Sequence, residues 1–89
     1  MLDELLILKK IKGGDIKAFE ELFRRYYFPL CCYAAGITGQ MAVAEEIVEE
    51  LFYVLWKERE RLQIFQSVKS YLYRATRNQS LQYCEHEEV

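Results

Sequence analysis

The chain has 89 residues, of which 52% are hydrophobic and 29% are charged, so one domain with a buried core and a charged surface is expected. A domain of this length leaves little volume beside its core for a deep substrate cavity, and a single proline with four glycines excludes collagen-like and linker-like chains. The apolar stretch over residues 26–37 is too short for a transmembrane helix, which needs about 20 apolar residues. The acidic start at Asp3 and Glu4 is unlike a secretory signal, so we expect a cytoplasmic protein without membrane insertion.

Helical spacing dominates the first half of the chain, and no useful stretch alternates with the period of two typical of strands. A short first helix is predicted from Leu2, Leu5, Leu6 and Ile11, and Gly13-Gly14 ends it. Asp15 is a natural N-cap for a second helix. Its apolar stripe consists of Ile16, Phe19, Phe23, Tyr26 or Tyr27, Leu30, Ala34 and Ile37. Pro29 lies within this stripe, so we expect it to kink or split the helix.

The second half predicts two more helices. The third runs from about Met41 to Arg61, and its core face consists of Ala44, Ile47, Val48, Leu51 and Leu55. After a short loop, Ser67 or Ser70 can cap a fourth helix. One side of that helix carries Val68, Tyr71, Leu72, Ala75 and Gln79. The predicted fold is all-α, a compact bundle of three long helices plus one short N-terminal helix.

Residues for enzyme chemistry are missing from the sequence. The single histidine, His86, lies among acids near the end, and a metal site would need Cys84 and His86 with distant ligands that no paired motif supplies. The glutamates from Glu45 to Glu50 could suggest a carboxylate-bridged metal pair, but the Glu-x-x-His partners of such a site are absent. We therefore predict no catalytic residue, no metal and no cofactor.

An acidic segment marks the third helix. Glu46, Glu49 and Glu50 are three and four residues apart, so they share one face with Tyr53 one turn further on. The simplest interpretation of these clustered glutamates is a helix face exposed to solvent. The aromatic residues nearby exceed what one core stripe can hold, namely Phe52, Tyr53 and Trp56. Glutamates beside exposed aromatic side chains would suit docking of a basic partner helix.

The fourth helix has the opposite charge, because residues 61–84 contain four basic residues and no acid. Lys69, Tyr73, Arg74, Arg77 and Asn78 lie on or near one side, and Arg61 and Phe65 stand in the preceding loop. Cations interleaved with aromatic rings suit single-stranded nucleic acid, since the cations bind phosphates and the rings stack on bases. An ordinary solvated basic face with half-buried tyrosines explains the composition equally well.

Three segments resemble the second conserved region of bacterial sigma factors of the extracytoplasmic-function group. Gly14-Asp15, Ala18-Phe19, Leu22-Phe23 and Tyr26-Tyr27 resemble its start. The segment from Ala44 to Phe52, continued by Leu55-Trp56, resembles the helix that binds core polymerase. The segment from Ser70 to Asn78 resembles the helix that faces DNA. The three segments occur in the family's order, between Gly13 and about Cys84.

This resemblance implies a promoter-recognition domain that binds the clamp helices of the β′ subunit of core RNA polymerase. Its last helix and the loop before it would recognise and melt the −10 promoter element by holding the non-template strand. The implied polymerase-binding residues are Glu46, Glu49 and Glu50, with Tyr53 on the same face. The implied DNA-binding residues are Arg61, Phe65, Lys69, Tyr73, Arg74, Arg77 and Asn78. The resemblance also allows an anti-sigma factor as a partner.

The chain departs from the family pattern in its last residues. Where the family often continues with arginines, Glu85, Glu87 and Glu88 follow here, and Glu49 replaces the usual glutamine. These departures keep open an alternative, a helical interaction module that docks on polymerase or another basic partner without DNA binding. The second, −35-binding domain of such factors is not encoded here. We therefore expect a piece of a longer protein or a reduced relative, and favour the piece, with a domain over residues 1–84 and the start of a linker or a frayed tail over residues 85–89.

Overall fold

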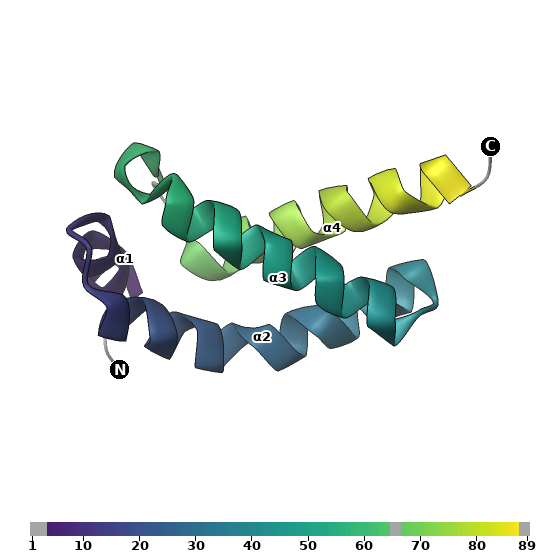
Figure 1. The fold of residues 1–89 in the computed structure, drawn as a ribbon, viewed down its shortest axis with the longest axis horizontal. Helices are drawn as coiled ribbons and strands as arrows, with labels where there is room; N and C mark the ends of the chain where they lie inside the picture. Colours follow the sequence, from purple (N-terminus) through teal and green to yellow (C-terminus); the bar gives the residue numbers. More distant parts are fainter. Residues whose placement is uncertain (1–3, 65–66, 88–89) are drawn as a thin grey trace.

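A computed structural model describes residues 4–64 and 67–87, and everything in it is helix or connection. In chain order the elements are α1 (Glu4–Lys12), α2 (Ile16–Thr38), α3 (Met41–Lys57), the 3₁₀ turn η1 (Arg59–Arg61) and α4 (Val68–Glu87). The three long helices lie along one another, and the short α1 sits at the end of the bundle where α2 begins (Figure 1). No strand occurs among the described residues, so the predicted all-α fold is confirmed.

The ends of α1 and α2 follow the local signals in the sequence. Asp15 caps α2, because its Oδ1 accepts hydrogen bonds from the backbone N–H groups of Lys17 and Ala18 at 3.0 and 3.2 Å. Gly14 and Gly39 adopt φ values of 92° and 79°, in the left-handed region that favours glycine. These two glycines let the chain reverse after α1 and after α2.

Pro29 does not split α2, which continues without interruption from Ile16 to Thr38. The expected split is absent for a physical reason. Pro29 lies on the exposed side of the helix, so the carbonyl of Arg25 that loses its partner can bond to water.

The third helix ends at Lys57 rather than at Arg61, and η1 follows it. Arg59 explains the early end. Its guanidinium carbon lies 4.3 Å from the centre of the Trp56 ring, and its Nη1 donates a 2.9 Å hydrogen bond to the Trp56 carbonyl. The Arg59 side chain thus donates to the Trp56 carbonyl, which would accept a backbone hydrogen bond if the helix were longer.

Aromatic rings fill the space between α2 and α3. Phe23 meets Phe52 edge to face at 5.0 Å, and Phe19 lies 5.1 Å from Trp56. Phe52 is 1% exposed, so it belongs to the core and not to the aromatic surface that the sequence suggested. The predicted stripe of α2 is confirmed at Tyr26, Leu30 and Ala34. Ile16 is exposed instead, and the other buried positions are Ala18, Leu22 and Cys31.

The inner face of α4 agrees with the prediction at Val68 and Leu72 and differs from it at the other positions. The buried residues are Val68, Leu72, Thr76 and Ser80, which repeat every four positions. Tyr71 and Gln79, assigned to the core side from the sequence, are exposed. Small side chains at Thr76 and Ser80 allow close packing in the bundle, whereas a tyrosine at that depth would need far more room. No described helix is long and apolar enough to span a bilayer.

Candidate functional site

The glutamates of α3 point away from the core. Ala44, Val48 and Leu55 are buried on the inner side, as predicted, while Ile47 and Leu51 are only half-buried. On the outer side Glu46, Glu49, Glu50 and Tyr53 are all exposed, and we call these four residues the acidic face. Tyr53 is 59% exposed, so aromatic surface does accompany the carboxylates. The structure therefore brings the four predicted polymerase-binding residues together on one helix.

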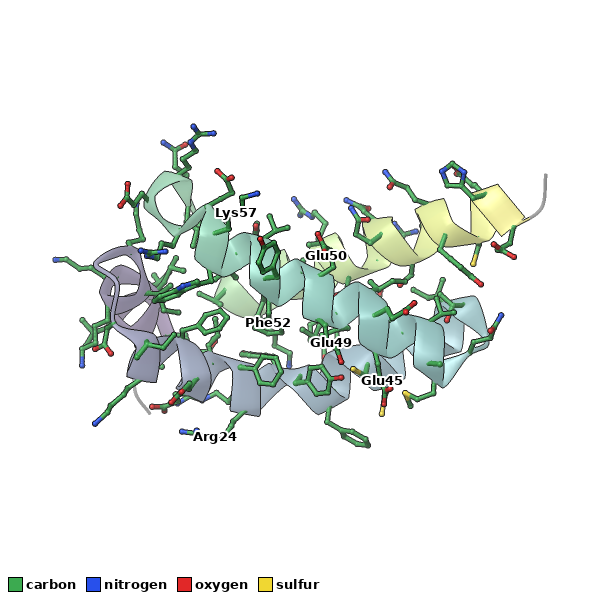
Figure 2. The ribbon with its side chains drawn as sticks, in the orientation of Figure 1. Arg24, Glu45, Glu49, Glu50, Phe52 and Lys57 are labelled. Carbon is green, nitrogen blue, oxygen red and sulfur yellow. The ribbon has the colours of Figure 1, made fainter. Side chains whose placement is uncertain are left out.

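The acidic face has two flanks with different neighbours. Figure 2 shows Glu45 and Glu49 on the side of α3 that faces α2, and Glu50 and Lys57 on the opposite side. The hydroxyl of Tyr27 on α2 donates a 3.0 Å hydrogen bond to Glu49 Oε2. Burial, followed by this bond, raises the pKa of the Tyr27 hydroxyl above its ordinary value. Glu49 is thus held by the bundle, while Glu46 and Glu50 stand on the outer flank.

A groove runs between α3 and α4 beside this outer flank. It has a volume of about 530 Å³, and Glu46 and Glu50 are among its lining residues. Its apolar lining comes from Val43, Ile47, Leu51, Val54, Leu55, Tyr71 and Tyr83. Val54 is 42% exposed and Tyr71 37% exposed, so this lining is accessible. The hydrophobic pattern of α4 gives no sign of this groove, because it predicts Tyr71 on the core side.

The predicted DNA-binding residues of α4 form two parallel stripes along the helix. Arg74 and Asn78 are four residues apart and both exposed, and Lys69, Tyr73 and Arg77 form the second stripe at the same spacing. We call these five residues the basic face. The charged members and Asn78 are exposed, and Tyr73 is half-buried. Asn78 therefore does not fill the core, and its amide is accessible.

Tyr73 is packed against a ring from another helix. Its ring meets that of Tyr33 on α2 edge to face at 5.1 Å, and Tyr33 is itself 36% exposed. Tyr73 is four residues from both Lys69 and Arg77, and Tyr33 adds a second partly accessible ring beside it, an arrangement that suits base stacking near phosphate-binding cations. Nothing in the periodicity of α4 indicates Tyr33, because the contact is made across two helices.

Arg61 and Phe65 differ from the residues on α4. Arg61 lies on η1, and its Nη1 pairs with Glu58 Oε1 at 3.4 Å, so its charge is partly balanced within the loop. Phe65 lies outside the described residues. At the other end, α4 continues through Glu85 to Glu87 and brings carboxylates onto the same helix as the basic face. The division of the chain at residue 84 stays a prediction.

Comparison with known families agrees with this arrangement. The family profile described as Sigma-70 region 2 matches residues 22–88, which is most of the chain. A search of curated proteins and a search of solved structures each find no match. The match includes α3, η1 and α4 completely and begins inside α2, so α1 is outside it.

The protein is a sigma-factor domain. More specifically, the chain belongs to the Sigma-70 region 2 family, whose members are not enzymes. Sigma-70 region 2 binds core RNA polymerase and recognises and melts the −10 promoter element during transcription initiation. The predicted sigma-factor function is thereby confirmed, and the family match specifies neither the extracytoplasmic-function group nor the individual contact residues.

Proposed function

We propose that the acidic face of α3 is the polymerase contact and that the basic face of α4 holds the non-template strand of the −10 element. The domain would act in the cytoplasm as part of a sigma factor of the extracytoplasmic-function group. The three sequence segments that resemble this group support that assignment. The first segment covers the start of α2, the second lies within α3, and the third lies within α4.

The exposure of both charged surfaces is the observation that carries the proposal. Each glutamate of the acidic face and each cation of the basic face is exposed, although both helices are amphipathic and bury their opposite sides. Clustered like charges repel one another and lower stability unless a partner compensates for them. An acidic and a basic surface on separate helices therefore suit two different partners, one cationic and one anionic.

The chemistry of the acidic face favours a basic helical partner, as the clamp helices of the β′ subunit would provide. Glu46 and Glu50 also border the apolar groove between α3 and α4. A partner helix with apolar side chains flanked by lysine or arginine fits this combination of groove and border. We propose that an anti-sigma factor would compete with polymerase here, because a ligand in the groove would cover the same two carboxylates.

Charge reversal on the outer flank tests the polymerase contact. Glu46→Lys and Glu50→Lys change exposed side chains, so the fold should survive, and mispaired charge at an interface costs several kcal/mol. Glu20→Lys is a matched control, because Glu20 is exposed on α2 outside the acidic face. We expect both α3 variants to lose core polymerase in a pull-down and Glu20→Lys to retain it. Equal retention by all three variants would show that polymerase binds elsewhere.

The acidic end of α4 is the feature that favours the alternative function, an interaction module that does not bind DNA. A module that docks on polymerase without binding DNA would lose polymerase in the same pull-down. It would show no dependence on the basic face, however. Transcription from −10 variants by holoenzyme carrying substitutions in that face therefore separates the two functions.

A further inference from the structure

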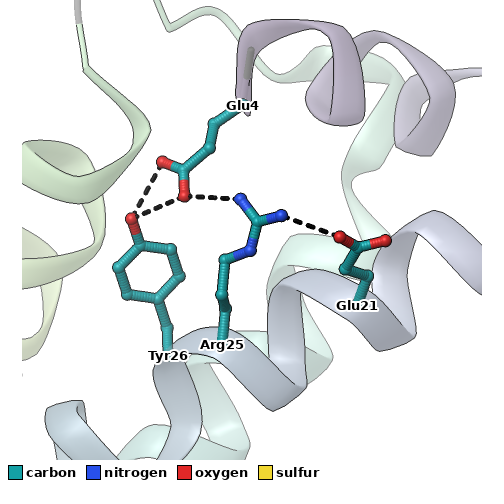
Figure 3. A network of polar contacts seen from close by, with 4 residues as sticks. All are labelled: Glu4, Glu21, Arg25 and Tyr26. Atoms are coloured by element: carbon teal, nitrogen blue, oxygen red, sulfur yellow. Dashed lines mark hydrogen bonds and ion pairs between the residues drawn. The ribbon is translucent and has the colours of Figure 1, made fainter. Parts of the chain in front are cut away.

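Helix α1 lies outside the residues that match the family, yet it is firmly attached at both ends. At its start, Glu4 accepts a 3.0 Å hydrogen bond from Arg25 Nη1, and the single proton of the Tyr26 hydroxyl is shared between the two carboxylate oxygens of Glu4, each 2.8 Å away (Figure 3). Along its length Ile7 and Ile11 are buried at 2% and 0% exposure. A helix held this firmly occupies a fixed position relative to the rest of the bundle.

The other end of α1 reaches the segment that leads into α4. Lys12 Nζ donates a 2.8 Å hydrogen bond to the carbonyl oxygen of Leu62, a residue 50 positions away in the chain. Leu62 follows η1 with extended backbone angles, φ −63° and ψ 132°, so its carbonyl is not part of a helix. A charged donor thereby fixes a peptide group that lacks regular structure around it.

Apolar contact surrounds this bond. A groove of about 460 Å³ lies between α1 and the segment 62–64, and its lining residues are Leu5, Leu8, Lys9, Lys12, Leu62, Gln63 and Ile64. Leu8 and Leu62 are 5% and 8% exposed, so they are buried beside the open part of the groove. Helix α1 also contacts η1 and α4, so its position affects the position of the start of α4, where the basic face begins.

We infer that Lys12 is a positioning residue for promoter recognition: it fixes the segment 62–64 against α1 and so sets where the start of α4 meets the non-template strand. This inference rests on the proposed function of the basic face. It adds to the family's function a role for a helix that the family match does not include. Lys12 acts through Leu62 and touches no base.

The test compares three variants in holoenzyme reconstituted with the full-length factor. Lys12→Met keeps the aliphatic stem and removes the donor, and Lys12→Arg keeps a charged donor. Lys10→Met is the matched control, because Lys10 is an exposed cation in the same last turn of α1 but does not line the groove. It therefore controls for loss of positive charge at the helix C-terminus. Transcription is measured on a library of −10 variants, and amide hydrogen exchange of residues 62–64 is followed in each protein.

We expect Lys12→Met to change the relative preference among −10 sequences by about fivefold or more, the scale of one altered base pair. It should also speed exchange in residues 62–64. Lys12→Arg should restore both properties, and Lys10→Met should leave both as in the wild type. Unchanged preference in Lys12→Met, or an equal loss on all sequences in Lys12→Met and Lys10→Met, would overturn the inference.

Failure of this inference is distinguishable from failure of the proposed function. If Asn78→Ala alters the preference and Lys12→Met does not, only the role of Lys12 is wrong. If neither variant alters it, the basic face does not read the promoter. If Lys12→Met lowers the amount of folded protein, hydrogen exchange and preference are compared in Lys12→Arg, and a changed preference with unchanged exchange in residues 62–64 would overturn the inference.

Discussion

Tyr27 on α2 donates a 3.0 Å hydrogen bond to Glu49 on α3, so one carboxylate of the acidic face is also part of the contact between two helices. Glu46 and Glu50, by contrast, border the groove toward α4. The acidic face therefore combines one carboxylate fixed by the bundle with two on its outer flank. This difference separates effects on stability from effects on binding.

Glu49→Lys should abolish binding to core polymerase and also lower stability. The reversed charge would oppose a basic partner, and loss of the bond to Tyr27 should cost about 0.5–1.5 kcal/mol. Tyr27→Phe is the control, because it loses the same bond and leaves the carboxylate exposed. Urea unfolding should show similar destabilisation in the two variants, whereas a pull-down should show loss of polymerase in Glu49→Lys alone. Retention of polymerase by Glu49→Lys would remove Glu49 from the contact.

Ionisation of the Tyr26 hydroxyl should lower the stability of the fold at alkaline pH. Burial and the bond to Glu4 raise the pKa of its hydroxyl to about 12, from an ordinary value of 10.0. Because the pKa is raised in the folded state, the contribution is complete below pH 10 and is lost as the pH rises toward about 12. We expect the free energy of unfolding to fall through this range, and to fall less steeply in Tyr26→Phe. Parallel curves for the two proteins would contradict the assigned cause.

The buried hydroxyls of α4 should contribute nothing to stability. Thr76 Oγ1 and Ser80 Oγ are buried, and neither has a hydrogen-bond partner within the described part of the chain. Removing an unsatisfied buried polar group is neutral or stabilising when the shape is kept. We expect Thr76→Val and Ser80→Ala to unfold at urea concentrations equal to or above that of the wild type. A loss of more than about 1 kcal/mol in either variant would reveal a hydrogen bond that matters.

Sequence patterns located the helix caps and the exposed side of α3 because these are local properties. Asp15 caps α2 through its immediate neighbours, and the glutamates of α3 follow one helical period. The inner face of α4 was misassigned because a hydrophobicity pattern ranks Tyr71 above Ser80 as a core residue. Burial of Ser80 depends instead on how closely the helices pack. The bond between Lys12 and Leu62 joins residues 50 positions apart and has no periodic signal.

The cations of the basic face should act mainly through phosphates. Alanine at Lys69, Arg74 or Arg77 should weaken promoter binding by holoenzyme about equally on all −10 sequences, and should reduce the slope of log affinity against log salt by about 1. Binding measured by fluorescence at several salt concentrations tests this. A sequence-dependent loss at any of these positions would assign that residue to base recognition instead.

The central claim, that the basic face of α4 reads the −10 element, is tested most directly by Asn78→Ala. Transcription is measured on a library of −10 variants with holoenzyme containing wild-type or variant full-length factor. Because Asn78 is exposed, its loss should leave the melting temperature unchanged. We predict a change of about 1–3 kcal/mol in preference at one or more −10 positions. Identical preferences for the two holoenzymes would contradict the account and favour an interaction module that binds polymerase without reading DNA.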